Sequence, residues 1–297
     1  MISPAPATSP IAGATFWADP YSRAKVTADA WRVTRQADAQ QLDKIATQSV
    51  ARWIGNWNSN VQTDVNVATE TMVAAGALPV FVAYNIPQRD CGGYSGGNNM
   101  SAQAYRDWIL AFANGIGARR AAVVLEPDAL AGMECLSASD QQIRLDLLKF
   151  AVLTLASKGS IAVYLDAGNP RWKPAATIAP RLLAAGIAQA QGFSLNVSNF
   201  FLTAENVSYG NEVSALVGGK HFIVDTGRNG LGPAADAQWC NPAGRALGIR
   251  PTTATGNQLV DAYLWIKTPG ESDGSCNGAP ATGTWMPEYA LGLAQRG

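Results

Sequence analysis

Six short apolar runs in this chain each end in a cluster of acidic, amide or tyrosine residues, and this repetition constrains the fold most. Each run has the length and composition of a strand that is buried on both faces. In an α/β barrel, parallel strands bring such ends to one face, where the active site is built. The clusters are IPQRD to Asp90, EPD to Asp128, DAGN to Asn169, VSN to Asn199, TGRN to Asn229 and PGESD to Asp273.

Segments with apolar residues at helical spacing alternate with these runs. Ser101 and Ser139 fit helix N-caps, and Gly117 and Gly159 fit helix ends. The expected helices are 61–77, 101–117, 137–159, 179–191 and a closing helix within 284–297.

A further strand is expected in SVARWIGNW, near Trp53. Alternation of strands and helices with short turns predicts a parallel sheet with right-handed crossovers. Seven or eight such units favour one closed TIM-like β/α barrel, with its active site at the C-terminal ends of the strands, over an open sheet. The polar stretch 229–257 is long and irregular, which indicates a functional loop.

Composition limits the partners of the chain. The 297 residues include 47% apolar residues and 22 basic against 22 acidic side chains, so the formal net charge is zero. This balance gives no electrostatic reason to expect nucleic acid or an anionic membrane as a partner. No apolar run reaches the length of a membrane span. We expect a linker-like tail at 1–15, without signal-peptide regions, and a catalytic barrel domain at 16–297.

The four cysteines are Cys91, Cys135, Cys240 and Cys276. None forms a CxxC pair, and an even number suits two disulfides in an oxidising compartment, as in a secreted protein. Three pairings are possible. We favour Cys91–Cys135 and Cys240–Cys276 because the first two cysteines follow polar clusters and the other two flank the last cluster. Four buried free thiols are the alternative.

The single histidine, His221, opens the run HFIVD, at the opposite end of its strand from the polar clusters. It is therefore expected to be structural. A site with several histidine ligands is excluded, and a Ser-His-Asp or Cys-His arrangement could use only this residue. No glycine-rich phosphate-binding motif is present. We expect no metal or cofactor, so catalysis falls to carboxylates, tyrosine, lysine and arginine.

Paired carboxylates provide a mechanism for glycoside hydrolysis, with one acting as the protonated acid and the other, or a relay ending in it, as the base. Asp128 is the best candidate acid, because burial after AAVVL and the charge of Glu126 would both raise its pKa. Alternatively, Asp128 caps a helix that begins at PDAL. Asp90 lies in a glycine-rich loop, where Arg89 could hold a neighbouring carboxylate.

Other strand ends carry further candidates. Asp166 and Asp225 could be hydrogen-bond anchors and nothing more. Lys267, Glu271 and Asp273 fall within seven residues and could bind sugar hydroxyls or form a charged turn.

The tryptophans fall into two groups. Those beyond strand ends or in loops could stack on the apolar faces of sugar rings, whereas Trp31 and Trp108 lie in helical patterns and are expected in the core. The loop group is Trp53, Trp57, Trp172 and Trp239.

Read together, seven segments resemble glycoside hydrolase family 6, the cellulases that include endoglucanases and cellobiohydrolases. The matching segments are YNIPQRDCGG (84–93), VLEPDAL (124–130), YLDAGNPRW (164–172), NVSNF (196–200), DTGRNG (225–230), WCNPAGRALG (239–248) and WIKTPGESDG (265–274). In this family Asn169 often has a histidine counterpart, and Thr268 often a proline or leucine.

The resemblance implies a distorted parallel barrel that cleaves β-1,4-glucan with inversion at the anomeric carbon. Asp128 matches the general acid, Asp90 a carboxylate that supports it, and Tyr84 a residue that crowds the reacting sugar. Asp273 matches a proposed base that Arg228 and Lys267 would neutralise. A water chain near Ser198 is the alternative to a direct base.

The resemblance also assigns binding and supporting residues. Sugar stacking is expected from Trp53, Trp172 and Trp239, hydroxyl binding from Lys267 and Glu271, and further substrate contact from Asp166, Ser198 and Asn199. Arg89, Glu126 and Arg228 are expected to support the carboxylates.

The loops that could cover the active site are short. Cellobiohydrolases of the family carry long insertions that roof the site, whereas the segments before Trp239 and after Asp273 are brief here. An open cleft and endo cleavage are therefore favoured over a cellobiohydrolase. A silent glucan-binding barrel is disfavoured because the motif carboxylates are intact. The expected partner is cellulose or another β-1,4-glucan, bound by a monomer.

Overall fold

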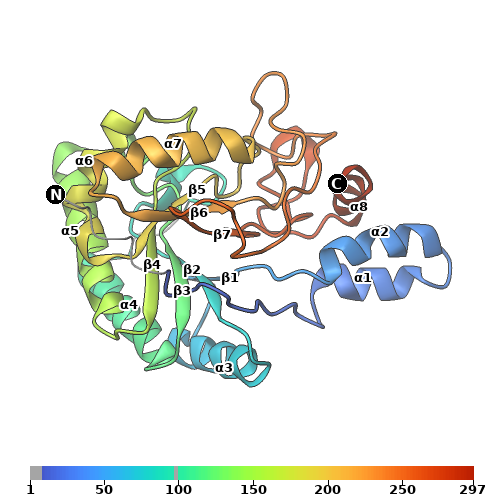
Figure 1. Cartoon of the computed structure of the whole chain (residues 1–297), viewed down its shortest axis with the longest axis horizontal. Coiled ribbons are helices and arrows are strands. Elements are labelled where there is room, and N and C mark those ends of the chain that lie inside the picture. The colour runs from blue at the N-terminus through green and yellow to red at the C-terminus, as the bar shows by residue number, and fades with distance from the viewer. Residues whose placement is uncertain (1–8, 97–99) are drawn as a thin grey trace.

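The fold is a single curled sheet of seven parallel strands surrounded by helices (Figure 1). A computed structural model describes residues 9–96 and 100–297. Each strand pairs with the next along the chain, which confirms the predicted distorted β/α barrel. The strands are β1 (Arg52–Gly55), β2 (Val80–Tyr84), β3 (Ala121–Leu125), β4 (Ile161–Asp166), β5 (Gly192–Leu195), β6 (His221–Asp225) and β7 (Val260–Leu264).

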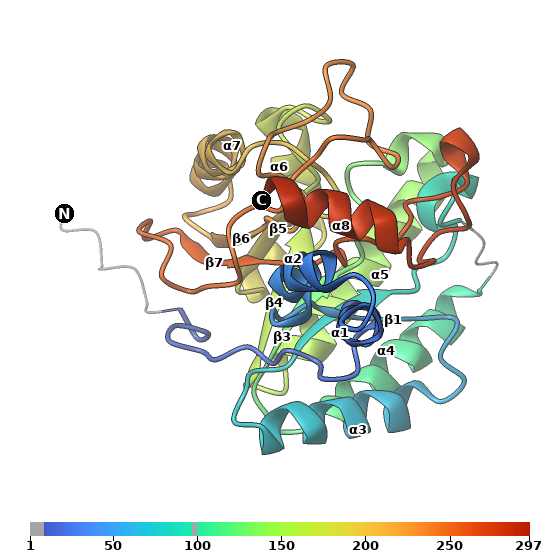
Figure 2. The ribbon, with the colours of Figure 1, turned by 90° about the vertical axis from the view of Figure 1, so that its right-hand side faces the viewer.

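Five helices each connect one strand to the next, from β1 to β6. Three other helices, from the two ends of the chain, pack beside the opening between β1 and β7 (Figure 2). The helices on the barrel are α3 (Val61–Ala74), α4 (Ala102–Ile116), α5 (Ala138–Ala156), α6 (Ala175–Ala184) and α7 (Thr203–Leu216). The helices beside the opening are α1 (Arg23–Trp31), α2 (Gln36–Ala46) and α8 (Pro287–Arg296), which share one apolar cluster.

The edges of the sheet meet without a ladder between β1 and β7. The Ala51 amide donates to the Trp265 carbonyl at 2.9 Å, and the Trp53 indole Nε1 donates to the Ile266 carbonyl at 2.8 Å. These two bonds hold the barrel together beside the cleft.

Successive residues of each strand point to opposite sides of the sheet, and both sides are covered by an apolar core. This burial on both sides explains why the strands are continuous apolar runs in the sequence. In β2, Phe81 and Ala83 pack outward against the helices, whereas Val82 and Tyr84 face the barrel interior. Tyr84 is the last inward-facing residue of its strand, so it reaches the active-site end.

Most expected helices are present, with shifts at their ends. Ser101 caps α4 by accepting from the Ala104 amide, and Gly117 ends it at a φ of 65°. Ser137 rather than Ser139 caps α5, because its hydroxyl accepts from the Asp140 amide. Helix α6 begins four residues before the predicted 179, and α1, α2 and α7 were not predicted.

The predicted long loop and the structural histidine are confirmed. Between β6 and β7, a stretch that is described throughout, there is no helix or strand, and one isolated bridge joins Thr252 to Tyr263. His221 lies at the base of the barrel with its Nδ1 2.7 Å from Asp261 Oδ1. The Tyr164 hydroxyl donates to the other oxygen of Asp261.

Residues 1–8 of the expected tail lie outside the described part of the chain. Ile11 is buried, and the Leu78 amide donates to the Thr15 carbonyl at 2.8 Å. The boundary at residue 16 stays a prediction. Within 9–96 and 100–297, no helix combines the length and apolar character that a membrane crossing requires.

Candidate active site

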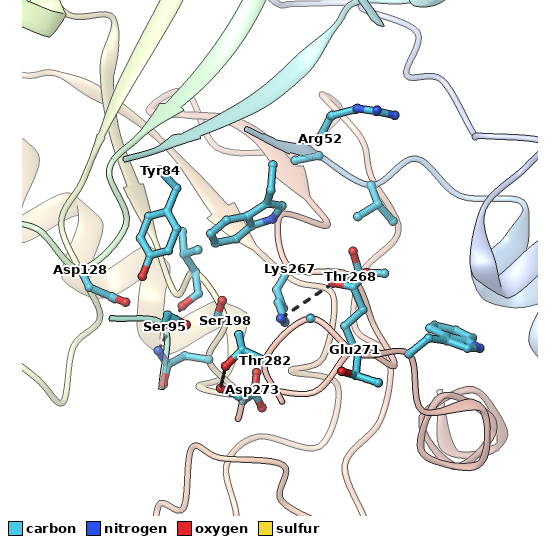
Figure 3. Close-up of a pocket in the computed structure, with 18 of the residues that line it drawn as sticks. Arg52, Tyr84, Ser95, Asp128, Ser198, Lys267, Thr268, Glu271, Asp273 and Thr282 are labelled. Carbon is cyan, nitrogen blue, oxygen red and sulfur yellow. Dashed lines mark hydrogen bonds and ion pairs between the residues drawn. The ribbon is translucent and has the colours of Figure 1, made fainter. Parts of the chain in front are cut away.

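A cleft of about 1620 Å³ opens at the C-terminal ends of the strands. Figure 3 shows Tyr84, Asp128 and Ser198 pointing into it from the ends of three strands, and Asp273 from the segment that follows β7. Most of the predicted site residues line the cleft, as the repeated strand-end pattern predicts. These are Trp53, Tyr84, Arg89, Asp90, Asp128, Trp172, Ser198, Asn199, Trp239, Lys267, Glu271 and Asp273.

Asp128 sits three residues beyond β3 in a left-handed backbone conformation, with a φ of 70°. Its amide donates to Asp166 Oδ2 at 3.0 Å, and no helix begins there, so the helix-capping alternative is wrong. Burial is the main cause that raises the pKa of the Asp128 carboxyl well above its usual value. The negative charges of Asp166 and Asp90 add to this effect.

Glu126 has a different role from the predicted one. It is fully buried, and its carboxylate accepts from the amides of Asn85 and Ile86 and from the Tyr105 hydroxyl. These bonds tie the end of β2 to β3, while burial raises the pKa of Glu126 to about 7. The expectation that Glu126 supplies the charge that raises the pKa of Asp128 is corrected, since Asp166 and Asp90 supply it.

Asp166 is an anchor beneath the cleft rather than part of its lining. Only 1% of it is exposed, and it accepts from the amides of Asp128 and Gly168 and from the Ser194 hydroxyl. The expected direct contact of Asp166 with substrate is therefore corrected. Burial raises the pKa of Asp166 to about 6.

The same arrangement occurs at β5 and β6. Ser198 is also left-handed, with a φ of 61°, and its amide donates to Asp225 Oδ2 at 3.1 Å. Asp225 further accepts from the amides of Gly227 and Lys267, and burial raises its pKa. Asp225 is thus the anchor that the sequence analysis left as one alternative.

Asp90 lies in a tight loop after β2, where Gln88, Asp90 and Cys91 all have positive φ values of 53°, 53° and 49°. The Ser95 amide donates to Asp90 Oδ2 at 2.9 Å. Left-handed conformations of non-glycine residues are costly and persist only where the surroundings hold them.

Arg89 supplies part of that support. Its guanidinium donates to the carbonyls of Tyr84 and Ser95 at 2.7 and 2.9 Å and lies 4.3 Å from the Tyr84 ring centroid. In the described chain its hydrogen bonds go to carbonyl and amide oxygens, so the expected bond to a carboxylate is corrected. Arg144, which sequence reasoning missed, donates to the Pro87 and Gln88 carbonyls from the side of α5.

Asp273 forms a buried ion pair with Arg228, in which Nη1 lies 2.9 Å from Oδ2. The amide of Asn241 donates to the same oxygen at 3.0 Å, a contact that the sequence analysis missed. Arg228 also donates to the Ser198 carbonyl. Lys267 donates to the Ser272 carbonyl at 3.2 Å and lies 3.9 Å from Glu271, and burial lowers its pKa.

Aromatic side chains border the cleft at several points. Trp57, Trp172 and Trp239 are 55%, 38% and 50% exposed, as expected of loop tryptophans, whereas Trp108 is buried in the core. Trp53 packs edge-on against Tyr84, with ring centroids 5.2 Å apart.

Sequence reasoning missed other aromatic residues of the cleft. Tyr94, Trp17 and Trp285 line it too. Tyr94 stands in GGYSGG, where glycine on both sides was the available signal for a side chain set into a tight loop.

The two predicted disulfides are present, as Cys91–Cys135 and Cys240–Cys276. The first ties the Asp90 loop to the loop after β3. The second ties the β6–β7 loop to the segment after Asp273. Within the residues that the structure describes, no group of three histidine, cysteine, aspartate or glutamate side chains could hold a metal ion.

A barrel whose cleft joins exposed indoles to a shielded carboxyl with a raised pKa and a second carboxylate is typical of glycoside hydrolases. The family model "Glycosyl hydrolases family 6" matches residues 11–297. The chain belongs to this family, as the sequence motifs predicted.

Known proteins of high similarity bear endoglucanase names. Endoglucanase A of Cellulomonas fimi is 44% identical over 94% of the chain, which spans 61% of that protein's length. Endoglucanase 1 of Streptomyces halstedii is 43% identical over 93% of the chain and 87% of its own length. The solved structure of endoglucanase Cel6 from Mycobacterium tuberculosis, with a thio-linked cellobioside, is 45% identical with a TM-score of 0.93, covering 97% and 99% of the two chains.

Proposed function

We propose that this chain hydrolyses internal β-1,4-glucosidic bonds of cellulose or a related β-glucan with inversion of the anomeric centre. The observation that carries this proposal is the position of Asp128, whose carboxyl faces the cleft and has a raised pKa. A carboxyl with a raised pKa keeps its proton near neutral pH and can donate it to the leaving oxygen. The endoglucanase names of the similar proteins agree with this activity.

In the proposed reaction, Asp128 protonates the glycosidic oxygen while a water attacks the anomeric carbon from the opposite face of the sugar. The attacking water loses a proton as the glycosidic C–O bond breaks. Oδ2 of Asp273 already accepts from the Arg228 guanidinium and from the Asn241 backbone amide, so this oxygen is not free to take a proton from the attacking water. We assign this proton to a water relay beside Ser198 that ends at the Asp90 carboxylate, which also supports Asp128.

Binding of the glucan is assigned to the tryptophan rings that line the cleft and to the polar pair Lys267 and Glu271. Trp53, Trp172 and Trp239 would stack on sugar faces, and Lys267 and Glu271 would bind hydroxyls. Side chains that remain between 38% and 50% exposed at the border, such as Trp172 and Trp239, favour a cleft that accepts the middle of a long polymer.

The wider setting is also part of the proposal. Two disulfides suit an extracellular enzyme. We expect a secreted monomer that acts on polysaccharide without cofactor, metal, nucleic acid or membrane.

The test measures the viscosity of carboxymethylcellulose against the number of reducing ends released. Cuts in mid-chain lower viscosity steeply while few ends appear, so a sharp initial fall is expected. Asp128→Asn serves as the inactive control. A shallow curve with cellobiose as nearly the only early product would indicate a cellobiohydrolase instead, and no reducing ends would indicate a glucan-binding barrel.

A further inference from the structure

Tyr94 lies in the loop that carries Asp90 and is half exposed at the border of the cleft. The residues on either side of it, Gly93 and Ser95, both donate hydrogen bonds to Asp90. The amide of Ser95 donates to Asp90 Oδ2 at 2.9 Å, and the amide of Gly93 donates to the Asp90 carbonyl at 2.7 Å. A displacement of Tyr94 would therefore be transmitted directly to the Asp90 carboxylate.

Tyr94 also contacts the segment that follows β7. Its ring lies over Gly274, where an added Cβ would come within 2.4 Å of Tyr94 Cγ. Its carbonyl accepts from the Thr282 hydroxyl at 3.1 Å, and that hydroxyl lies equally close to the carbonyl of Asp273. Figure 3 shows Thr282 beside Asp273 on this side of the cleft. The tyrosine thus joins the Asp90 loop to the segment of Asp273.

A third contact reaches the β6–β7 loop. The rings of Tyr94 and Trp239 are 6.1 Å apart between centroids and tilted by 53°. Aromatic pairs at this distance and tilt attract each other. The Tyr94 side chain therefore contacts both the segment that follows β7 and the β6–β7 loop.

The Asp90 loop needs such support because its backbone is strained. Asp90 and Cys91 are both left-handed, and such conformations persist only when several contacts enforce them. The Cys91–Cys135 disulfide fixes the first half of the loop to the β3 side. The contacts of Tyr94 fix the second half to the β7 side.

We propose that Tyr94 is a positioning residue that holds Asp90 against Asp128, because its ring latches the Asp90 loop to Gly274 and Trp239. The inference rests on the proposed roles of Asp90 and Asp128. The aromatic ring performs this function through packing, so its hydroxyl is not required.

The kinetic signature of this role differs from that of a sugar-binding ring. Tyr94→Ala is expected to lower kcat about 10- to 100-fold, the size of effect that a misplaced catalytic group produces, with a smaller change in KM. Tyr94→Phe should retain wild-type kcat. Leu110→Ala, at a half-exposed site on α4, is the control for loss of an exposed apolar side chain.

The pH profile gives a second readout. The charged or titratable groups that face the Asp128 carboxyl are Asp90 from the β2 loop, Asp166 from β4 and Tyr84 from β2. If Asp90 moves away, one negative charge is lost from beside Asp128, and the alkaline limb of kcat/KM moves to lower pH. A ring that only binds sugar would leave this limb in place.

A double-mutant cycle isolates the contact itself. Gly274→Ala should displace Tyr94 and reduce kcat in the wild-type background but have little further effect in the Tyr94→Ala background. Equal effects in both backgrounds would mean that backbone strain at Gly274, not the latch, is responsible, and would overturn the proposal.

Other outcomes are equally decisive. A Tyr94→Ala enzyme with unchanged kcat and a raised KM would show that Tyr94 only binds sugar. If the wild-type protein hydrolyses no glucan, the proposed function fails, whereas an active wild type with an unaffected Tyr94→Ala variant refutes only the latch.

Discussion

Replacing Asp166 by asparagine should change the pH dependence of hydrolysis without changing substrate binding. Asparagine keeps the geometry, because its carbonyl oxygen can accept from the Asp128 and Gly168 amides as Asp166 Oδ2 does. Its amide group can donate to the Ser194 hydroxyl, which can also act as an acceptor. The substitution therefore removes the negative charge while keeping the anchor.

The size of the effect follows from the position of the two carboxyl groups. Asp166 Oδ2 lies 3.0 Å from the Asp128 amide nitrogen, and side-chain reach places the two carboxyls within roughly 7 Å of each other. At an effective dielectric constant of about 20, a unit charge at that distance contributes about 2 kcal/mol, or between one and two pKa units. Because the pKa of Asp166 is raised only to about 6, Asp166 is charged at the neutral and alkaline pH values where Asp128 would lose its proton.

The direction in which the pH profile moves follows from the proposed role of Asp128 as the acid. Asp128 must be protonated, so kcat/KM falls as pH rises through its pKa in the free enzyme. Loss of the neighbouring charge lowers that pKa, and the alkaline limb should move down by one to two pH units while KM stays within about twofold. The measurement is kcat/KM against pH on a soluble cello-oligosaccharide.

Asp261→Asn is the matched control, since it removes a buried carboxylate at the opposite end of the barrel. This variant should lose stability without moving the alkaline limb. If the alkaline limb of kcat/KM stays in place or moves to higher pH in a folded Asp166→Asn enzyme, the electrostatic reasoning is refuted. A large rise in KM would instead indicate that Asp166 contacts the substrate directly.

Three further outcomes test the proposed chemistry. Asp128→Asn should abolish hydrolysis of cellulose-like substrates, since general acid catalysis contributes roughly 100- to 10,000-fold. The variant should still hydrolyse a glucoside with an activated phenol leaving group, because that group needs little protonation. Equal loss on both substrates in a folded variant would contradict the acid role. Proton NMR of fresh digests should show the α-anomer before mutarotation, and an initial β signal would mean retention. Trp172→Ala should weaken binding of long oligosaccharides more than short ones, measured by calorimetry, and a uniform loss would place Trp172 beside the scissile bond.

The strands were predictable from sequence because burial on both faces gives an unambiguous apolar run. The missed helices lack that kind of signal. Helix α7 contains Asn206, Tyr209, Gly210 and Ser214 on its buried side, so its apolar periodicity is weak. Helices α1 and α2 pack through several alanines against Trp265 and α8, and that partner is more than two hundred residues away in sequence.

The candidate site was predictable as a set of residues but not as a network. Motif resemblance identified Asp128, Asp90 and Asp273, whereas their supporting partners follow from tertiary geometry. Asn241 and Asp273 are separated by 32 positions in the sequence, with β7 between them, and Arg144 reaches the backbone of the Asp90 loop from within helix α5. Neither contact has a local sequence signal, because any polar residue at those positions reads as surface.

The distance of a polar residue from its strand end decides whether it enters the cleft. Asp166 and Asp225 are the last residues of β4 and β6, and both are buried as anchors. Asp128 and Ser198 are each the third residue beyond β3 and β5, and both line the cleft in left-handed conformations. In each pair the amide of the cleft residue donates to the anchor on the next strand.

This repeated arrangement shows why Asp166 is an anchor, the alternative that its position at a strand end suggested, and not a residue of the cleft lining. The hydrogen bond from an amide to a buried carboxylate is charge-assisted, and it offsets the cost of a left-handed residue, which is on the order of 1 to 3 kcal/mol. The anchor therefore fixes the direction of a side chain that belongs to the preceding strand. The carboxyl proposed as the acid and the structural carboxyl can thus be the same residue type at the same end of the barrel. Only their offset from the strand and their hydrogen-bond partners separate the two roles.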